Sequence, residues 1–132
     1  MQPENKKQLS IVRFEHAQEC LNTARNLIEL GDFKTAANRS YYAVFHSMRA
    51  VLAFDGIDMK HHSGIIAEFR RRYIKTGIFE TKLSGYITKL FTVRNDSDYD
   101  DFYVVSKDRV LEQVEMADYF LDSIDSYLKN KN

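Results

Sequence analysis

Apolar residues recur every three or four positions in five stretches of the chain, a spacing that places them on one face of an α-helix. These stretches are 14–28, 37–51, 66–73, 83–91 and 110–128. No run of alternating apolar and polar residues is long enough to form a sheet, since the β-prone segment 103–105 has only three residues. The pattern therefore predicts an all-α protein, a mostly up-and-down bundle of about five helices.

Turn and capping residues separate the five stretches. Gly31 is expected to end the first helix, and Asp32 is placed to cap the second. The second helix should end at 55–56 and be followed by a loop over 56–62, whereas the third should end near 76–77. A polar stretch over 95–101 is expected to follow the fourth helix. The residues placed to cap the third, fourth and fifth helices are Ser63, Thr81 and Ser106.

Composition indicates one ordinary globular domain. The 132 residues, 44% hydrophobic and 29% charged, are expected to form a single domain over 1–132 with its core at about 10–128. Because Cys20 is the only cysteine, it cannot form an internal disulfide, and a reducing compartment is expected. The longest apolar run has five residues, 50–54, and no targeting signal is visible. We therefore expect a cytoplasmic protein that does not enter a membrane.

Charge is balanced overall but unevenly distributed. The 19 basic and 19 acidic residues argue against general binding to nucleic acid or a membrane surface. Residues 60–94 nevertheless contain eight Lys or Arg and two Glu, whereas residues 95–128 contain two basic and ten acidic residues. The densest basic segment is either a solvated helix face or a phosphate-binding strip, with the acidic last helix facing a basic partner or a second copy. This strip consists of Arg70, Arg71, Arg72 and Lys75.

The second predicted helix carries a polar stripe. Its members follow one another at spacings of three, four and three, so that they share one face: Arg39, Tyr42, His46 and Arg49. That face should lie roughly opposite the apolar one. Guanidinium, hydroxyl and imidazole groups in a row can hold a phosphate or transfer a proton. The stripe could equally be an exposed polar face, or a contact for a partner or a second copy.

Arg94 interrupts the apolar pattern of the fourth helix. Leu83, Ile87 and Leu90 predict another apolar residue at position 94. A charge in such a place needs an anion or a cleft, because an unpaired buried charge is costly. Asp98 could pair with Arg94 if the helix continues. The alternative is an arginine that binds phosphate in a cleft, with Asp98 and Tyr99 beside it.

Common cofactor and metal signatures are absent. The chain has no glycine-rich phosphate loop, no His-Glu-x-x-His and no cysteine pair. The acidic run 96–101 lacks the glycine and the glutamate that a calcium loop requires at its sixth and twelfth positions. The adjacent His61 and His62 have no further ligand near them in the sequence. We therefore expect no metal and no cofactor.

Four segments follow one another along the chain: 36–46 (AANRSYYAVFH), 62–64 (HSG), 73–77 (YIKTG) and 94–99 (RNDSDY). Together they resemble the HEPN superfamily (higher eukaryotes and prokaryotes nucleotide-binding), in particular its small single-domain prokaryotic branch, and the resemblance covers about residues 10–128. It implies a helical bundle that dimerises around a cleft. Many members are metal-independent endoribonucleases, and some are toxins neutralised by a partner protein, often a minimal nucleotidyltransferase.

The chemical motif of the family is incomplete in this chain. In the family an arginine is followed after four to six residues by a histidine, and the resemblance assigns the arginine to Arg94. Tyr99, Asp100 and Asp101 occupy the three positions where that histidine would stand. Some relatives carry a tyrosine, modified by the partner, two residues after the histidine, and here that position is an aspartate.

The first hypothesis is a dimeric binding module with weak or no catalysis. It would hold RNA or a nucleotide through Arg94, Arg39 and the basic strip, beside a nucleotidyltransferase partner. The second is an endoribonuclease in which Arg94 stabilises the phosphorane, and Tyr99, Asp98 or His46 transfers the proton. The third is a structural dimer or adaptor in which the pair between Arg94 and Asp98 only stabilises the bundle.

Overall fold

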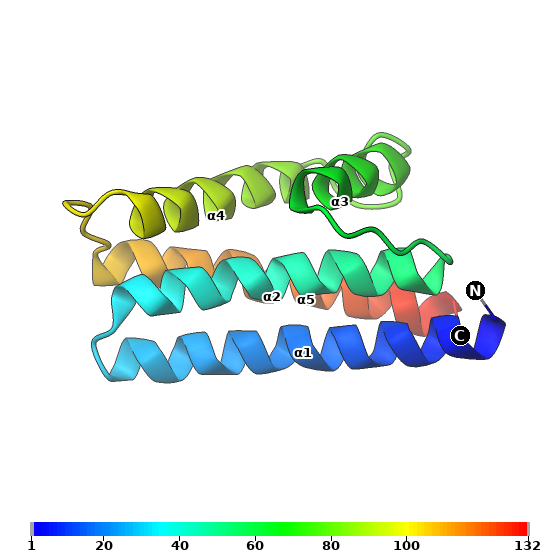
Figure 1. Ribbon diagram of the computed structural model, residues 1–132, viewed down its shortest axis with the longest axis horizontal. Helices are drawn as coiled ribbons and strands as arrows, with labels where there is room; N and C mark the ends of the chain where they lie inside the picture. Colours follow the sequence, from blue (N-terminus) through cyan, green and yellow to red (C-terminus); the bar gives the residue numbers. More distant parts are fainter. Residues whose placement is uncertain (1, 132) are drawn as a thin grey trace.

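The computed structural model describes residues 2–131, which form helices and no strand (Figure 1). The elements are α1 (Pro3–Glu29), α2 (Phe33–Phe54), α3 (His62–Phe69), the π-helical segment η1 (Arg70–Ile74), α4 (Lys82–Tyr99) and α5 (Lys107–Lys131). The predicted all-α bundle of five helices is confirmed. Over the described part of the chain, none of these helices combines the length and the apolar character needed to cross a membrane.

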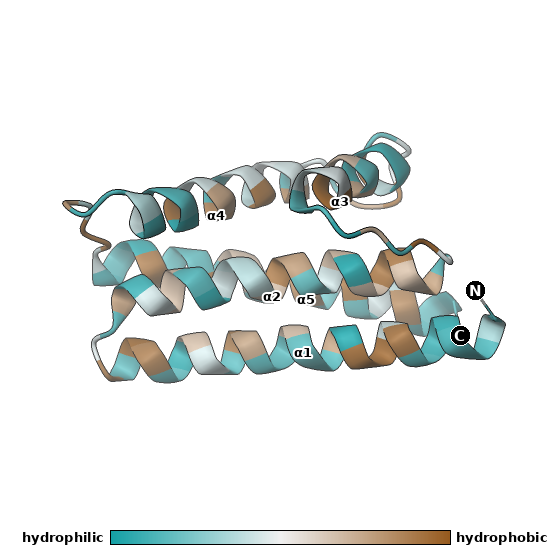
Figure 2. Ribbon diagram, viewed as in Figure 1, coloured by the Kyte–Doolittle hydropathy of each residue, from teal (hydrophilic) through white to brown (hydrophobic). Residues whose placement is uncertain are grey.

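Helix α2 is the centre of the bundle. It packs against α1, α3, α4 and α5, and Figure 1 shows α1 and α4 on opposite sides of it with α5 behind. More than half of its 22 residues are buried, among them Tyr41, Val44 and Met48. Hydrophobic and hydrophilic bands alternate along every helix in Figure 2, as expected for helices that each bury one face. The polar stripe of α2 is therefore only partly exposed, because neighbouring helices lie on both sides of it.

Two of the predicted caps are confirmed and two are not. The Asp32 carboxylate accepts a hydrogen bond from the Thr35 backbone N–H at 3.1 Å, and the Ser106 hydroxyl oxygen accepts one from the Arg109 N–H at 3.1 Å. The cap at Ser63 is wrong, because α3 already begins at His62. Thr81 occupies the cap position of α4, but its side chain makes no capping bond.

Helix α4 is longer than its apolar pattern suggests. It continues past Phe91 to Tyr99, so most of the polar stretch expected after the helix, 95–99, forms its last turns, and only 100–101 follow it. The reason lies in the buried face, which runs from Leu90 to Val93 and Ser97 rather than to Arg94. Arg94 consequently stands beside the buried face, with 17% of its side chain exposed.

The short helical segment over 62–74 is fastened to the bundle by aromatic and polar contacts. The π-helical turn is closed by a hydrogen bond from the Lys75 N–H to the Arg70 carbonyl at 2.9 Å. The Phe69 ring packs on Phe79 and Phe120, each with ring centroids 5.6 Å apart. The ring contacts hold α3 and η1 against α5 and the loop before α4, and the segment forms one wall of a groove whose other wall is α4.

Candidate functional site

Arg94 lies between α4 and α2, in contact with a tyrosine pair. One guanidinium nitrogen, Nη2, donates to the Tyr42 hydroxyl at 3.0 Å. The guanidinium carbon lies 5.4 Å from the Tyr41 ring centroid and 5.3 Å from that of Tyr42, within cation–π range. Arg94 Nε is 3.0 Å from Asp98 Oδ2, but its N–H is not directed at that oxygen, so the contact is an ion pair without a well-directed hydrogen bond.

Arg39 reaches the same tyrosine from α2. Its guanidinium carbon lies 5.1 Å from the Tyr42 ring centroid. Its Nε and Nη2 donate to the Asn38 side-chain oxygen at 3.1 and 2.7 Å, and the Asn38 amide donates to Asp98 Oδ2 at 3.4 Å. We call these five residues the arginine–tyrosine cluster: Asn38, Arg39, Tyr42, Arg94 and Asp98. Asp98 pairs directly with Arg94 and is linked to Arg39 only through Asn38, so the two guanidinium groups and one carboxylate leave an excess of one positive charge.

His46 belongs to the polar stripe but lies apart from Arg94. Its ring stacks on His16 of α1 with centroids 4.2 Å apart, whereas the Tyr42 centroid is 5.9 Å away. Burial, together with the positive charges of His16, Arg49 and Arg39, lowers the pKa of His46 to about 4. His46 is therefore neutral near pH 7. Within residues 2–131, no interaction joins it to Arg94.

A groove adjoins the arginine–tyrosine cluster. This α3–α4 groove, of about 680 Å³, is lined by His61, His62, Ser63, Ile66, Ala67, Arg70, Ile87, Thr88 and Phe91. His62 Nδ1 lies 3.4 Å from the Tyr41 hydroxyl, and Phe91 packs on the Tyr41 ring at 5.9 Å between centroids. Burial and the nearby Arg94 and Arg49 lower the pKa of His62. The groove is of the size of small-molecule sites, and aromatic rings connect it to Arg94.

Arg49 occupies a different part of α2. It is ten residues from Arg39, or about 15 Å along the helix axis at 1.5 Å per residue. Its Nη2 lies 3.9 Å from Asp58 Oδ1, and the same oxygen accepts a hydrogen bond from the buried Arg13 at 2.7 Å. Burial and the charge of Arg13 lower the pKa of Arg49. Arg13 and Arg49, through their contacts with Asp58, link α1 and α2 to the loop after α2.

Replacing Asp58 with asparagine is expected to lower the free energy of unfolding by about 1–3 kcal/mol, because the buried Arg13 loses its counter-charge. The hydrogen bond from Arg13 lowers the pKa of Asp58 in the folded state. Its contribution is therefore complete above the unfolded pKa near 3.8 and disappears as the pH falls through the lower, folded value. Urea unfolding of both proteins at pH 7 and near pH 3 measures this, and equal differences at the two pH values would contradict it.

The predicted basic strip is not a row of free charges. Arg70 donates to the Ser84 hydroxyl and carbonyl and to the Thr88 hydroxyl, at 2.7–3.0 Å, and thereby ties η1 to α4. Arg71 and Arg72 both pair with Glu68. Lys75 is exposed after η1. That these residues bind a phosphate chain stays a prediction.

Tyr99 is at the far end of α4. It is the last residue of the helix and is 75% exposed. Among the described residues, no hydrogen bond or ring contact connects it to Arg94. The structure thus brings Arg39, Tyr42, Arg94 and Asp98 together, with the His46 ring 5.9 Å from that of Tyr42 and Arg70 in the adjoining α3–α4 groove. The other predicted site residues, Tyr99, Arg49, Arg71, Arg72 and Lys75, lie elsewhere.

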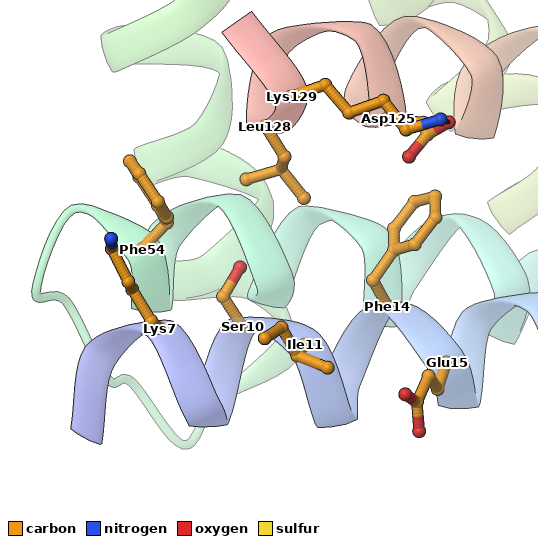
Figure 3. A pocket seen from close by; sticks show the side chains of 9 residues that line it. All are labelled: Lys7, Ser10, Ile11, Phe14, Glu15, Phe54, Asp125, Leu128 and Lys129. Atoms are coloured by element: carbon orange, nitrogen blue, oxygen red, sulfur yellow. Dashed lines mark ion pairs between the residues drawn. The ribbon is translucent and has the colours of Figure 1, made fainter. Parts of the chain in front are cut away.

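Figure 3 shows a second hollow, between α1 and the end of α5. Phe14 and Leu128 project into it, and Lys129 pairs with Asp125 at its rim at 2.9 Å. Its volume is about 190 Å³, which is below the range of ligand pockets, and its walls are mainly apolar. We assign no site to this hollow.

Sequence reasoning missed several residues that the structure brings to the site. Asn38, which links Arg39 to Asp98, has no periodic signal. Tyr41 belongs to the apolar face and is fully buried, yet its ring lies beneath Arg94 and its hydroxyl contacts His62. The only available signal was the adjacency of Tyr41 and Tyr42 in a segment of the family resemblance.

Comparison with known proteins decides the family. A family model described as the HEPN domain matches residues 12–127. The chain belongs to the HEPN domain family. This HEPN domain is 32% identical over 114 residues to a UPF0332 protein of Thermotoga maritima, with 86% of each chain covered.

Two further relatives come from Methanocaldococcus jannaschii. This HEPN domain is 30% identical over 118 residues to "Putative toxin MJ0142", with 89% of this chain and 80% of the relative covered. It is 32% identical over 120 residues to "Putative toxin MJ0605", with 87% and 85% covered. The resemblance found in the sequence is confirmed.

Proposed function

We propose that this HEPN domain is a toxin-like module that binds RNA or a nucleotide through phosphate, with little or no cleavage activity of its own. The observation that carries the proposal is the placement of two guanidinium groups against the Tyr42 ring, with a single carboxylate, Asp98, paired with one of them. Guanidinium groups bind phosphate oxygens through paired, charge-assisted hydrogen bonds. A phosphate is the group that best balances the remaining positive charge.

The α3–α4 groove supports a ligand that carries a base as well as a phosphate. His62 and Phe91 line the groove and also contact Tyr41, on whose ring Arg94 lies. Nucleobases stack on such side chains with about 1–3 kcal/mol per base. A base in the groove would bring its phosphate towards Arg94.

Proton transfer is the weak point of the alternative, an endoribonuclease. A general base works best when its pKa is near the working pH. The pKa of His46 is lowered to about 4, and its Nδ1 is buried. Tyr99 is exposed and lies away from Arg94. Binding without efficient cleavage therefore fits the arrangement better.

The partners proposed with this function are a second copy of the chain and a nucleotidyltransferase. Acidic residues follow one another along the outer side of α5, where Asp108, Glu112, Glu115 and Asp122 are exposed and Asp118 is half-buried. Asp118 already pairs with Arg25 at 3.0 Å. The other acidic side chains offer negative charge to a basic surface of a partner.

The proposal is tested with a fluorescently labelled single-stranded RNA and, in parallel, a labelled ATP, each titrated with the protein in EDTA. We expect binding whose constant falls with salt. Two phosphate contacts to a single strand correspond to a slope near −1.4 in log K against log salt. Binding of RNA alone, or of ATP alone, identifies the ligand class.

The same samples, followed over hours on a denaturing gel, test for cleavage. We expect intact RNA. Cleavage in EDTA would replace the proposal with a metal-independent endoribonuclease. Neither binding nor cleavage by the folded protein would leave the structural dimer or adaptor.

A further inference from the structure

A second cluster of chemical groups lies on the other side of the polar stripe, where α1 meets α2. His16 and Cys20 are one helical turn apart on α1, and both face His46 on α2. One ligand atom from each residue lies within 4.8 Å of the other two. His16 is exposed, His46 is half-buried and Cys20 is buried, so the cluster is open to solvent from one side only.

We propose that His16, Cys20 and His46 bind a divalent transition-metal ion of the zinc class. Two imidazole nitrogens and one thiolate form a ligand set typical of Zn²⁺, and the spacing of four residues puts His16 and Cys20 on one face of α1. Three protein ligands leave the fourth tetrahedral position for water or a ligand. The exposed face beside His16 gives the ion a way in.

In the described part of the chain, one buried atom of these three residues is unpaired, whereas the Cys20 sulfur accepts a weak hydrogen bond from Arg39 Nη1 at 4.0 Å. His46 Nδ1 is buried, and the described residues give it no hydrogen-bond partner, an uncommon state for a buried polar atom. A metal ion bound through Nδ1 would satisfy this nitrogen.

The Cys20 thiol has to lose its proton when the metal binds. Burial raises its pKa, while Arg39, whose Nη1 lies 4.0 Å from the sulfur, opposes this rise. The S–H bond breaks as the metal–sulfur bond forms, and the proton leaves to the buffer. The affinity for Zn²⁺ should therefore increase with pH.

Two features of the site oppose metal binding and limit the affinity for Zn²⁺. The His16 and His46 rings are nearly parallel, at 16°, and a metal must lie near the plane of each ring it ligates. His16 is exposed, so its ring can rotate to meet the ion. Arg39 and Arg49 repel a cation, whereas the thiolate and the nearby Glu19 attract it. The site should therefore bind Zn²⁺ less tightly than a closed structural zinc site does.

The test uses the full chain, freed of metal with EDTA and desalted. Titration with Co²⁺ should give one ion per chain and a near-ultraviolet band from charge transfer between the Cys20 thiolate and cobalt. Competition with a chromogenic zinc chelator measures the affinity for Zn²⁺. Loss of outer-shell partners typically weakens a site 10- to 100-fold, so removal of a ligand should weaken it by at least about 10-fold.

Three variants make the result specific. Cys20→Ser should abolish the cobalt band, and His16→Ala should reduce the affinity for Zn²⁺ by at least about 10-fold. His61→Ala removes another exposed histidine, outside the cluster, and should change neither. Because His16 is exposed, its variant should fold, and circular dichroism checks this. Absence of a cobalt band in the wild-type protein, or a zinc affinity unchanged by His16→Ala, would overturn the proposal.

Discussion

Replacement of Arg94 by alanine is expected to weaken binding of RNA or a nucleotide by about 10- to 150-fold while the helical bundle stays folded. A hydrogen bond to a charged group contributes about 1.5–3 kcal/mol, which corresponds to this range. Arg94 holds the strongest set of contacts in the arginine–tyrosine cluster, since it touches both Tyr41 and Tyr42 and pairs with Asp98. The anisotropy titration with labelled RNA and ATP measures the loss.

Arg71→Ala is the matched control for this experiment. It removes the same positive charge from an exposed position where, among residues 2–131, the side chain pairs only with Glu68. We expect it to reduce binding no more than twofold if the cluster is the phosphate site. Equal losses in both variants would instead point to a diffuse basic surface.

Arg94→Lys separates charge from geometry. Lysine keeps the charge but lacks the planar fork, so it should restore only part of the binding lost in the alanine variant. Thermal unfolding of the wild-type protein, Arg94→Ala and Arg94→Lys completes the comparison. If Arg94→Ala only lowers the melting temperature and leaves binding intact, Arg94 serves the bundle alone. If neither property changes, Arg94 has no role in binding or stability.

Replacement of Phe69 by alanine is expected to cost about 3–5 kcal/mol of unfolding free energy, the largest effect on stability that we expect from one substitution. Phe69 is fully buried, and its ring lies 5.2–5.6 Å from those of Tyr73, Phe79 and Phe120, measured between centroids. In α3 the only other buried residue is Ile65. Since small domains are stable by about 5–15 kcal/mol, the loss would be a large part of the total. Urea unfolding measures it.

Phe102→Ala provides the control for this prediction. It removes the same side chain from the loop between α4 and α5, where Phe102 is 94% exposed. Its effect should stay within about 0.5 kcal/mol, as for surface substitutions away from special features. Similar effects of the two substitutions would contradict the packing of α3 and η1 described above. A milder variant, Phe69→Leu, tests the same contact if the alanine variant does not fold.

The sequence by itself was sufficient for the fold class, the number of helices and two helix starts. Periodicity is a local property: a residue three or four positions away lies on the same helix face whatever the helix packs against. The caps at Asp32 and Ser106 were predictable for the same reason, because each bonds to an N–H three residues ahead. The family resemblance was likewise carried by short segments such as 36–46 and 94–99.

The end of α4 required the tertiary structure. Val93 and Ser97 are buried only because α4 packs along α2 and α5, and this packing carries the helix through a polar sequence to Tyr99. That extension brings Asp98 one turn beyond Arg94 and makes their ion pair possible. A polar segment with few apolar residues gives too weak a local signal to decide this.

The composition of the candidate site was also decided by tertiary packing. Arg94 and Tyr42 are 52 residues apart, and periodicity assigns each to a helix face without saying which faces meet. For the same reason the sequence did not indicate that His16 and Cys20 lie beside His46, although one ligand atom of each residue lies within 4.8 Å of the others, less than the diameter of a helix. Helix faces follow from local spacing, whereas the neighbours of a side chain depend on how distant helices pack. This is why the sequence determined the bundle and the structure determined its sites.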